Sequence, residues 1–385
     1  MLEGGDPRYL EVCRLFAEVH ALDPADRAAA LEAIDDVELR AEVASLLAFD
    51  DNTPLVRDAP RARLESAQPG ARPPPPVVGL RLDGRYAVQR LVAEGGFGWV
   101  FCGQDAEDDA PVAIKLLKPV ADAEVAHQIH DAMAREARAL GELAADVPGI
   151  VGHRGTGTWH AADGEAYPYL VLDWVEGPTL AEWRLEQGQP PMTLAAAMAL
   201  LEPVAEALRA AHARGVAHRD VKPENLIRTV RRGAPTLVLI DFGAAKLAME
   251  RTRGFESTAG GPGMVTYRYC APEQLDRALG STGPWSDVHA LALVLVELMA
   301  GRHPWAGLSL LQTIGAATDP EVRPTPAQLD RVSNPAISTH MNPARMLSPA
   351  WNQRDVGTFW HALTEARTGG RRGPLARLAH LLRRN

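Results

Sequence analysis

A glycine-rich segment at residues 93–100, Ala-Glu-Gly-Gly-Phe-Gly-Trp-Val, lies between two runs of alternating apolar residues. Glycines at such a place allow backbone N–H groups to close over phosphate oxygens. The same pattern also occurs in plain hairpin turns. The segment therefore predicts either a phosphate-binding loop or an ordinary turn, and its glycines are Gly95, Gly96 and Gly98.

Lysine is scarce in this chain, because the 40 basic residues divide into 36 Arg and only four Lys, at positions 115, 118, 222 and 246. A compact ammonium and a planar guanidinium are not interchangeable, so a Lys kept against this bias suggests a chemical role. Lys115 ends the strand-like run Val-Ala-Ile-Lys. It is either a phosphate ligand or a strand lysine that reaches to water.

The stretch 218–226 reads His-Arg-Asp-Val-Lys-Pro-Glu-Asn-Leu. Here the sequence resembles the eukaryotic-type protein kinases, and specifically the Ser/Thr branch found in bacteria. The family's other motifs follow in order: Asp-Phe-Gly from Asp241, Ala-Pro-Glu ending at Glu273, and Asp287 ahead of an apolar helix. The resemblance covers roughly residues 86–367 and implies an α+β, bilobal kinase fold with a β-rich small lobe and a helical large lobe.

The resemblance implies a role for each charged residue in ATP-dependent phosphoryl transfer, which depends on positioning and charge neutralisation. Lys115 would hold the α- and β-phosphates and pair with Glu136, which otherwise is a surface i,i+4 partner. Asp220 would orient the substrate hydroxyl and accept its proton. Lys222 would neutralise the γ-phosphate, and it is the family's mark of Ser/Thr specificity.

The resemblance also implies ATP and Mg²⁺ as cofactors, with Mn²⁺ as a substitute. Asp241 and Asn225 would ligate the metal, because hard divalent cations prefer oxygen ligands. The backbone of Asp173 and Val175 would bind adenine at the hinge, behind the gatekeeper Leu172. The residues that would enclose the ring, or else belong to the core, are Val100, Ala113 and Leu226.

Two positions depart from the family's pattern. Ala93 replaces the first glycine of the phosphate loop, which could stiffen the loop and raise the KM for nucleotide. Ala292 stands in the helix after Asp287 at a position that is often Gly, which concerns packing only.

The family's Ala-Pro-Glu glutamate, here Glu273, is expected to have a buried Arg partner. Local sequence favours Arg323 and spacing favours Arg354, because only 18 residues separate Pro304 from Arg323 and two helices normally fit between. We choose Arg354, followed by a helix at 356–366.

Regulation is expected in the segment between Asp241 and Glu273. Arg219 precedes the catalytic Asp and would lack a partner unless a phosphate supplies one. We predict autophosphorylation at Ser257 or Thr258, less so at Thr252, while Thr266 matches a structural position of the family. A segment ordered without phosphate is the alternative.

The elements that would position these residues fall into consecutive regions. We expect a small helical module at 1–54, a Pro-rich linker at 55–80, a small lobe at 81–174, a large lobe at 175–367 and a basic tail at 368–385. Strand-like runs occur at 86–92, 99–103, 112–117 and 169–174, and helical runs at 124–143, 194–214 and 288–299. The tail is either a solvated helix or a segment that docks an acidic partner or a lipid surface.

Composition narrows the class of protein. Three widely separated cysteines exclude a disulfide scaffold, and a net charge of −9 gives no reason to expect nucleic acid as a partner. The most apolar run, 290–300, is shorter than the ~20 residues of a membrane span. We therefore expect a cytoplasmic protein with no membrane span. Its expected partners are protein substrates. Residues 1–54 are expected to dock a partner, to self-associate or to cap the small lobe.

Two other functions compete with a protein kinase. A pseudokinase that acts as a nucleotide-gated scaffold usually lacks one of the metal-binding or catalytic polar residues, and all are present here. A small-molecule kinase of the antibiotic-phosphorylating type does not usually carry Ala-Pro-Glu or a long activation segment, and both are present. The sequence therefore favours an active Ser/Thr protein kinase.

Overall fold

The structure is a computed structural model that describes most of the chain from residue 74 to 318. The described residues are 15, 19, 22, 24–36, 39–40, 43–44, 74–95, 98–119, 131, 133–135, 137–138, 141–242, 267–275, 279–306, 308, 310–318 and 355–367. Their helices and strands, in chain order, are α2 (Pro24–Glu32), β1 (Arg81–Leu82), β2 (Tyr86–Gly95), β3 (Gly98–Asp105), β4 (Pro111–Leu117), β5 (His153–His160), β6 (Ala166–Asp173), α5 (Leu180–Glu186), α6 (Leu194–His212), the 3₁₀ turn η2 (Pro223–Asn225), β7 (Leu226–Arg231), β8 (Ala234–Leu239), α9 (Pro272–Leu275), α10 (Pro284–Ala300), α11 (Leu310–Thr318) and α13 (Val356–Arg367).

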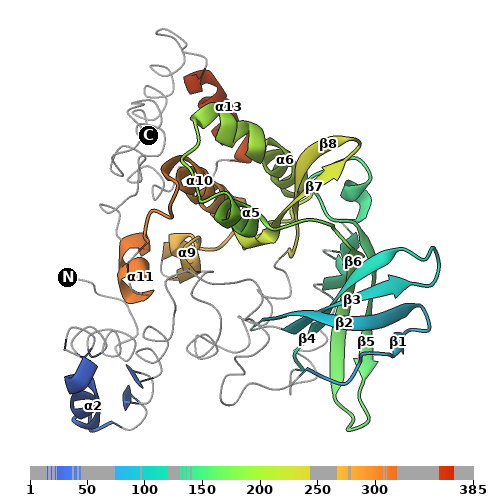
Figure 1. Cartoon of the computed structure of the whole chain (residues 1–385), viewed down its shortest axis with the longest axis horizontal. Helices are drawn as coiled ribbons and strands as arrows, with labels where there is room; N and C mark the ends of the chain where they lie inside the picture. The colour runs from blue at the N-terminus through green and yellow to red at the C-terminus, as the bar shows by residue number, and fades with distance from the viewer. Residues whose placement is uncertain are drawn as a thin grey trace.

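Strands β1 to β6 form one antiparallel sheet in the order β1-β2-β3-β4-β6-β5 (Figure 1). Side chains of β3 and β4 alternate between buried and half-buried, because successive residues of a strand point to opposite faces. Trp99, Phe101 and Ile114 pack with Tyr169 in the core of one face. The other face, which we call the cleft face, carries half-buried residues that include Val100, Ala113 and Lys115.

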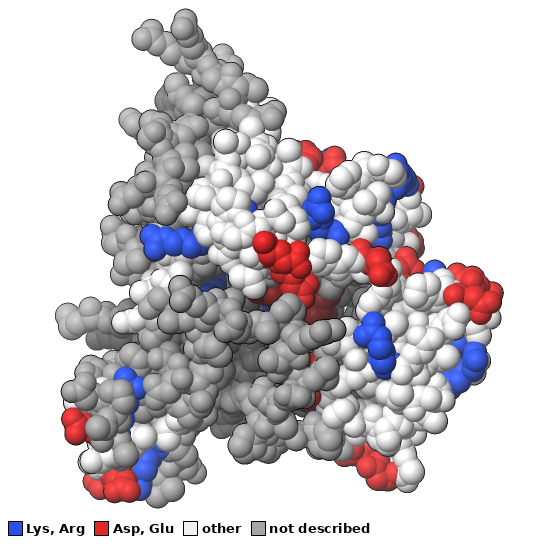
Figure 2. All heavy atoms as spheres, in the orientation of Figure 1, with Lys and Arg blue, Asp and Glu red and all other residues white. Residues whose placement is uncertain are grey.

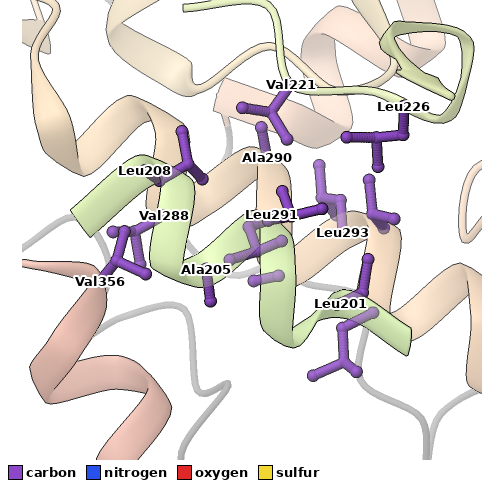
Figure 3. Close-up of a cluster of buried hydrophobic side chains, with 14 of the residues drawn as sticks. Leu201, Ala205, Leu208, Val221, Leu226, Val288, Ala290, Leu291, Leu293 and Val356 are labelled. Atoms are coloured by element: carbon purple, nitrogen blue, oxygen red, sulfur yellow. The ribbon is translucent and has the colours of Figure 1, made fainter. Parts of the chain in front are cut away.

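Helix α10 is the centre of the helical half of the molecule. Nearly all of its seventeen residues are buried, so it is covered on every side. Figure 3 shows apolar side chains of α6, α10, α13 and the loop before β7 packed together. Those labelled are Leu201, Ala205, Leu208, Val221, Leu226, Val288, Ala290, Leu291, Leu293 and Val356.

The expected α+β, two-lobed architecture is confirmed, with the sheet and the helices in separate parts of the molecule (Figure 1). The predicted strand runs overlap β2, β3, β4 and β6, and the helical runs overlap α6 and α10. Helix α13 covers the helix predicted at 356–366, and its side chains Phe359, Trp360 and Leu363 are buried. The predicted helix at 124–143 falls largely outside the described residues.

Strand β5 was not predicted from the sequence. Its residues 155–158 read Gly-Thr-Gly-Thr, and none of its residues is fully buried. A strand with so little apolar alternation looks like a loop until its partner is known. Its pairing with β6 along residues 153–160 supplies the backbone hydrogen bonds that the pattern does not reveal.

The N-terminal residues contain α2, which begins at Pro24, where the fixed φ of proline suits the first turn of a helix. Val19, Ile34 and Val43 are buried together nearby. Further along, Val77 packs in the core of the sheet, so the last residues before 81 already contact the small lobe.

The charged residues on the face shown in Figure 2 lie in small separate groups of either sign. Within the described part of the chain, no helix has both the length and the apolar character that crossing a bilayer requires. The division of the chain at the predicted domain boundaries stays a prediction.

Candidate active site

The loop before β7 brings three polar side chains together. Lys222 Nζ donates to Asp220 Oδ2 at 2.9 Å. Asn225 Nδ2 donates to the Asp220 carbonyl oxygen at 2.8 Å and to Asp220 Oδ2 at 3.1 Å. Asp220 is thus held from both sides by residues two and five positions further along the chain, as the short 3₁₀ turn η2 allows.

Asp287, near the start of α10, holds this loop in place through hydrogen bonds to its backbone. Its two carboxylate oxygens accept the backbone N–H groups of His218, at 2.7 Å, and Arg219, at 2.6 Å. Its side chain has no exposed surface. His212 Nε2 lies 2.7 Å from the same carboxylate, a contact that the sequence did not predict because a lone His near the end of a helix carries no pattern.

Gln274 is a second residue that sequence reasoning missed. Its amide Nε2 donates to the Arg219 carbonyl at 2.9 Å, and its Oε1 accepts the Ala271 N–H at 2.9 Å. Gln274 therefore connects the Ala-Pro-Glu segment to the loop before β7, which contains Arg219 and Asp220. Its position directly after Glu273 is the only sequence signal that could have identified it.

Lys115 and Asp241 meet across the boundary between the sheet and the helical half. Lys115 Nζ forms an ion pair with Asp241 Oδ1, although 126 residues separate them in sequence. Asp241 adopts a left-handed backbone with φ of 63°. This places a cation and a carboxylate at the base of the cleft face of the sheet.

Phe242 packs edge-on against the His218 ring, with centroids 4.5 Å apart. Burial lowers the pKa of His218, whose Nε2 lies 2.9 Å from the Ile240 carbonyl oxygen. A cavity of about 20 Å³ lies beside Phe242 and is lined by Lys115 and Asp241 together with Met133 and Ala137. The described helical residues Met133 and Ala137 therefore lie close to Lys115.

The strand register places the predicted nucleotide-binding residues on one face. Val100 lies opposite Lys115 and also opposite Ala93, and partners in register share a face. Ala113, two residues before Lys115, points the same way. Val100, Ala113 and Lys115 therefore lie on the same side of the sheet, and their contact with a nucleotide stays a prediction.

Gly98 has a structural reason to be glycine. It pairs with Gly95 across the hairpin between β2 and β3. A Cβ at Gly98 would lie 2.1 Å from the Leu116 carbonyl oxygen, so no side chain fits between these strands. Gly96 lies outside the described residues, and a phosphate-binding role for the loop stays a prediction.

The segment after β6 combines bonded and unbonded backbone groups. Asp173 N–H donates to the Gly152 carbonyl at 2.8 Å, and Trp174 N–H donates to the Pro111 carbonyl at 3.3 Å. Among the described residues, neither backbone group of Val175 forms a hydrogen bond. Val175 thus offers a donor and an acceptor, which is what a purine edge requires.

The donor chemistry at Asn225 and Asp241 suits a hard divalent cation. Because Asn225 uses its amide nitrogen on Asp220, its Oδ1 has no donor within the described part of the chain. Asp241 supplies a carboxylate. Amide and carboxylate oxygens are the ligands that Mg²⁺ and Mn²⁺ prefer.

Several predicted residues lie outside the described residues: Glu136, Thr252, Ser257, Thr258, Thr266, Arg323 and Arg354. Glu273 is described, and it accepts a hydrogen bond from Ser286 Oγ at 2.5 Å. Burial raises the pKa of Glu273. Its expected pairing with Arg354 stays a prediction.

Comparison with known protein families agrees with this geometry. A model of the protein kinase domain matches residues 86–342. The chain belongs to the protein kinase family. The sheet is accordingly the small lobe and the helical half is the large lobe.

The kinase is similar to the serine/threonine-protein kinases PknL and PknA of Mycobacterium tuberculosis. It is 34% identical to PknL over 276 residues, 70% of this chain, and 33% identical to PknA over 299 residues, 77% of this chain. In each case the alignment spans 64% of the relative's length. Pkn1 of Myxococcus xanthus is 32% identical over 256 residues, 65% of this chain and 33% of that protein.

A solved structure shows the same fold. The crystal structure of the Mycobacterium tuberculosis PknI kinase domain superposes with a TM-score of 0.54. The superposition covers 75% of this chain and 98% of that chain, at 24% sequence identity. The two-lobed architecture of this kinase is therefore that of a solved bacterial kinase domain.

Proposed function

We propose that this kinase transfers the γ-phosphate of ATP to Ser and Thr hydroxyls of proteins. The observation that carries the proposal is the joint placement of Asp220, Lys222 and Asn225 at one end of the cleft and of Lys115 beside Asp241 at its base. These residues supply a proton acceptor, two cations and two oxygen ligands, which are the parts that phosphoryl transfer requires.

In the proposed reaction, Asp220 orients the substrate hydroxyl and accepts its proton as the new O–P bond forms and the bond to the β-phosphate breaks. Lys222 balances the negative charge that gathers on the transferred group. Lys115 binds the α- and β-phosphates. The adenine lies between Val100 and Ala113 above and Leu226 below, with its edge at the backbone of Asp173 and Val175.

Mg²⁺ is the proposed metal, and Mn²⁺ is a substitute. When bound, the metal neutralises and orients the phosphates. Asn225 and Asp241 are the residues that would hold it, on the basis of their oxygen donors. Glu136 is the proposed partner of Lys115, because its neighbours in sequence, Met133 and Ala137, line a cavity together with Lys115.

The test is phosphate transfer by the purified chain, with labelled ATP, Mg²⁺ or Mn²⁺, and a generic basic protein as acceptor. We expect transfer to Ser or Thr, and its loss in Asp220→Asn and in Asp241→Ala. Asp163→Asn, an exposed aspartate in the turn between β5 and β6, is the matched control and should leave transfer unchanged. Nucleotide binding without transfer in either metal would favour a scaffold.

We also propose that phosphorylation of the activation segment controls the kinase. Among the described residues, the buried Arg219 Nε has no hydrogen-bond partner, so this cation is suited to receive a phosphate. Ser257 and Thr258 are the proposed autophosphorylation sites, with Thr252 as a weaker one.

Mass spectrometry of active protein tests this regulation. We expect a phosphate at Ser257 or Thr258, and lower activity when all three hydroxyl residues are replaced by Ala. Unphosphorylated protein with a fully active triple-Ala variant would refute this control while leaving the proposed activity intact.

Arg354 is proposed as the buried partner of Glu273, on the basis of chain spacing. If so, Arg354→Ala destabilises the protein by ~3–5 kcal/mol, and Arg323→Ala does not. A urea unfolding curve for each variant distinguishes the two arginines.

The proposed partners are protein substrates, and residues 1–54 are proposed to dock a partner or to self-associate. A groove there, lined by apolar residues including Val19, Leu22 and Ile34, is consistent with such a contact. The cytoplasm is the proposed location, since ATP is abundant there, and cell fractionation tests it.

A further inference from the structure

Arg154, on β5, links three carboxylates on the outer side of the small lobe. Its Nε donates to Asp173 Oδ1 at 2.6 Å. Its Nη1 donates to Asp108 Oδ2 at 2.6 Å and to the buried Asp105 Oδ2 at 3.3 Å. One guanidinium thus joins the turn between β3 and β4 to the first residue of the hinge.

Asp173 is the contact that matters, because it is the residue at which β6 ends and the hinge begins. Its backbone N–H is bound to the Gly152 carbonyl at 2.8 Å. Its carboxylate fills the space over Gly152, where a Cβ would lie 2.0 Å from Asp173 Oδ2. Gly152 therefore must lack a side chain for Asp173 to reach Arg154.

Arg154, in the small lobe, is the direct partner of the Asp173 carboxylate among the described residues. Arg231, on β7 of the large lobe, donates instead to the Pro148 and Ile150 carbonyls at 2.7 and 2.9 Å. Burial lowers the pKa of Arg231, and the charge of Asp173 opposes this shift only in part. The hold on the Asp173 carboxylate therefore comes from the small lobe.

We propose that Arg154 is a positioning residue for nucleotide binding: by holding the Asp173 carboxylate, it sets the hinge backbone at the distance from β4 that adenine requires. Ala113 on β4 lies opposite Leu172, the residue before Asp173. A shift of the hinge therefore changes the width of the slot between Ala113 and the Val175 backbone. The inference rests on the proposed nucleotide-binding function.

Arg85 is a matched control for Arg154, because it binds one of the same carboxylates, Asp105, in the small lobe. Arg85 donates to Asp105 through Nε and Nη2, both at 2.7 Å, and pairs with Glu107 at 2.6 Å. It has no contact with Asp173 among the described residues. Arg85→Ala therefore removes as much charge from the network as Arg154→Ala, without releasing the hinge.

The first measurement is hydrogen–deuterium exchange of the full chain without nucleotide. Arg154→Ala should speed exchange in a hinge peptide that contains residues 173–175, and Arg85→Ala should not. Arg154→Lys should give intermediate exchange, because an ammonium keeps the charge and loses the planar fork. Unchanged hinge exchange in Arg154→Ala, or equal acceleration in Arg85→Ala, would overturn the proposal.

The second measurement is steady-state kinetics at saturating acceptor. Arg154→Ala should raise the KM for ATP roughly five- to tenfold with kcat within about twofold of the parent, since the lost contact affects nucleotide binding equally before and during transfer. Arg85→Ala should change neither value. A parent that transfers no phosphate would count against the proposed function, while the exchange result would still decide the role of Arg154.

Discussion

Asp105 in the small lobe and Asp287 in the large lobe both have fully buried side chains, yet different partners satisfy them. Asp105 is covered by the guanidinium groups of Arg85 and Arg154. Asp287 accepts the backbone N–H groups of His218 and Arg219 and contacts His212. Asp105 also accepts the Glu107 N–H at 3.1 Å, but movable cations supply most of its contacts, whereas Asp287 holds the backbone of the loop that contains His218 and Arg219.

The difference shows that burial alone does not determine what a carboxylate contributes. The Arg85 and Arg154 side chains are 36% and 22% exposed, so both can turn to water if Asp105 is lost. The amides of His218 and Arg219 cannot find other partners unless the loop moves. Loss of a carboxylate should therefore cost most where its partners are fixed in the backbone.

The largest expected effect is that of Asp287→Asn. The amide nitrogen would replace one of the two oxygens that accept the backbone N–H groups of His218 and Arg219, so one buried N–H loses its acceptor. We expect a loss of ~3–5 kcal/mol in the free energy of unfolding and a fall in phosphate transfer of at least about 100-fold. Urea unfolding and a transfer assay measure both. If Asp287→Asn transfers phosphate within twofold of the parent rate, the contrast between Asp287 and Asp105 is wrong.

The next effect concerns Glu297, a partly buried carboxylate on α10, which accepts a hydrogen bond from Tyr269. Burial raises the pKa of Glu297 to about 7, against an ordinary value of 4.5. Between these values the folded state binds more protons than the unfolded state, so this residue lowers stability as pH rises from 4.5 to 7. It has no further effect above pH 7.

Glu297→Gln removes this titration. The difference in unfolding free energy between variant and parent should shift in favour of the variant by up to roughly 1.4 kcal/mol per pH unit across that window. Denaturant melts at pH 5, 6, 7 and 8 measure it. A difference that is independent of pH would show that Glu297 does not hold its proton, and would contradict the assigned effect of burial.

A smaller effect is expected for Asp105→Asn. The hydrogen bond from Arg85 is the main reason that the pKa of Asp105 lies well below its usual range. Its contribution is therefore present above the unfolded pKa of about 3.8 and is lost only as pH falls through the lower folded pKa. We expect a cost of about 1 kcal/mol at pH 7, persisting at pH 4. A loss of unfolding free energy as large as that of Asp287→Asn would mean that side-chain partners able to turn to water do not reduce the cost of losing the carboxylate.

The smallest effect is expected for Glu107→Gln. This side chain is 67% exposed and pairs with Arg85 at the edge of the small lobe. Water and salt screen such a pair. We expect no measurable change in melting temperature at 0.15 M salt. A clear loss would show that the network around Asp105 acts as one unit.

The sequence predicted the catalytic loop well, because its chemistry depends on residue types at short spacing. Asp220, Lys222 and Asn225 lie within six residues, so local backbone geometry is enough to bring them together. The apolar helix after Asp287 was also predicted, since its composition indicates burial on all sides. Strand β5 was missed because its identity comes from pairing with β6 rather than from its own residues.

The sequence by itself thus determined the family, the two-lobed architecture and the residues that could carry phosphoryl transfer. Only the tertiary structure decided which distant groups meet: Lys115 with Asp241 across 126 positions, His212 with Asp287 across 75, and Arg154 with Asp105 across 49. The physical reason is that residue types and short spacings constrain local conformation and burial. Partners far apart in sequence are chosen by how strands and helices pack, and that packing is a property of the whole chain.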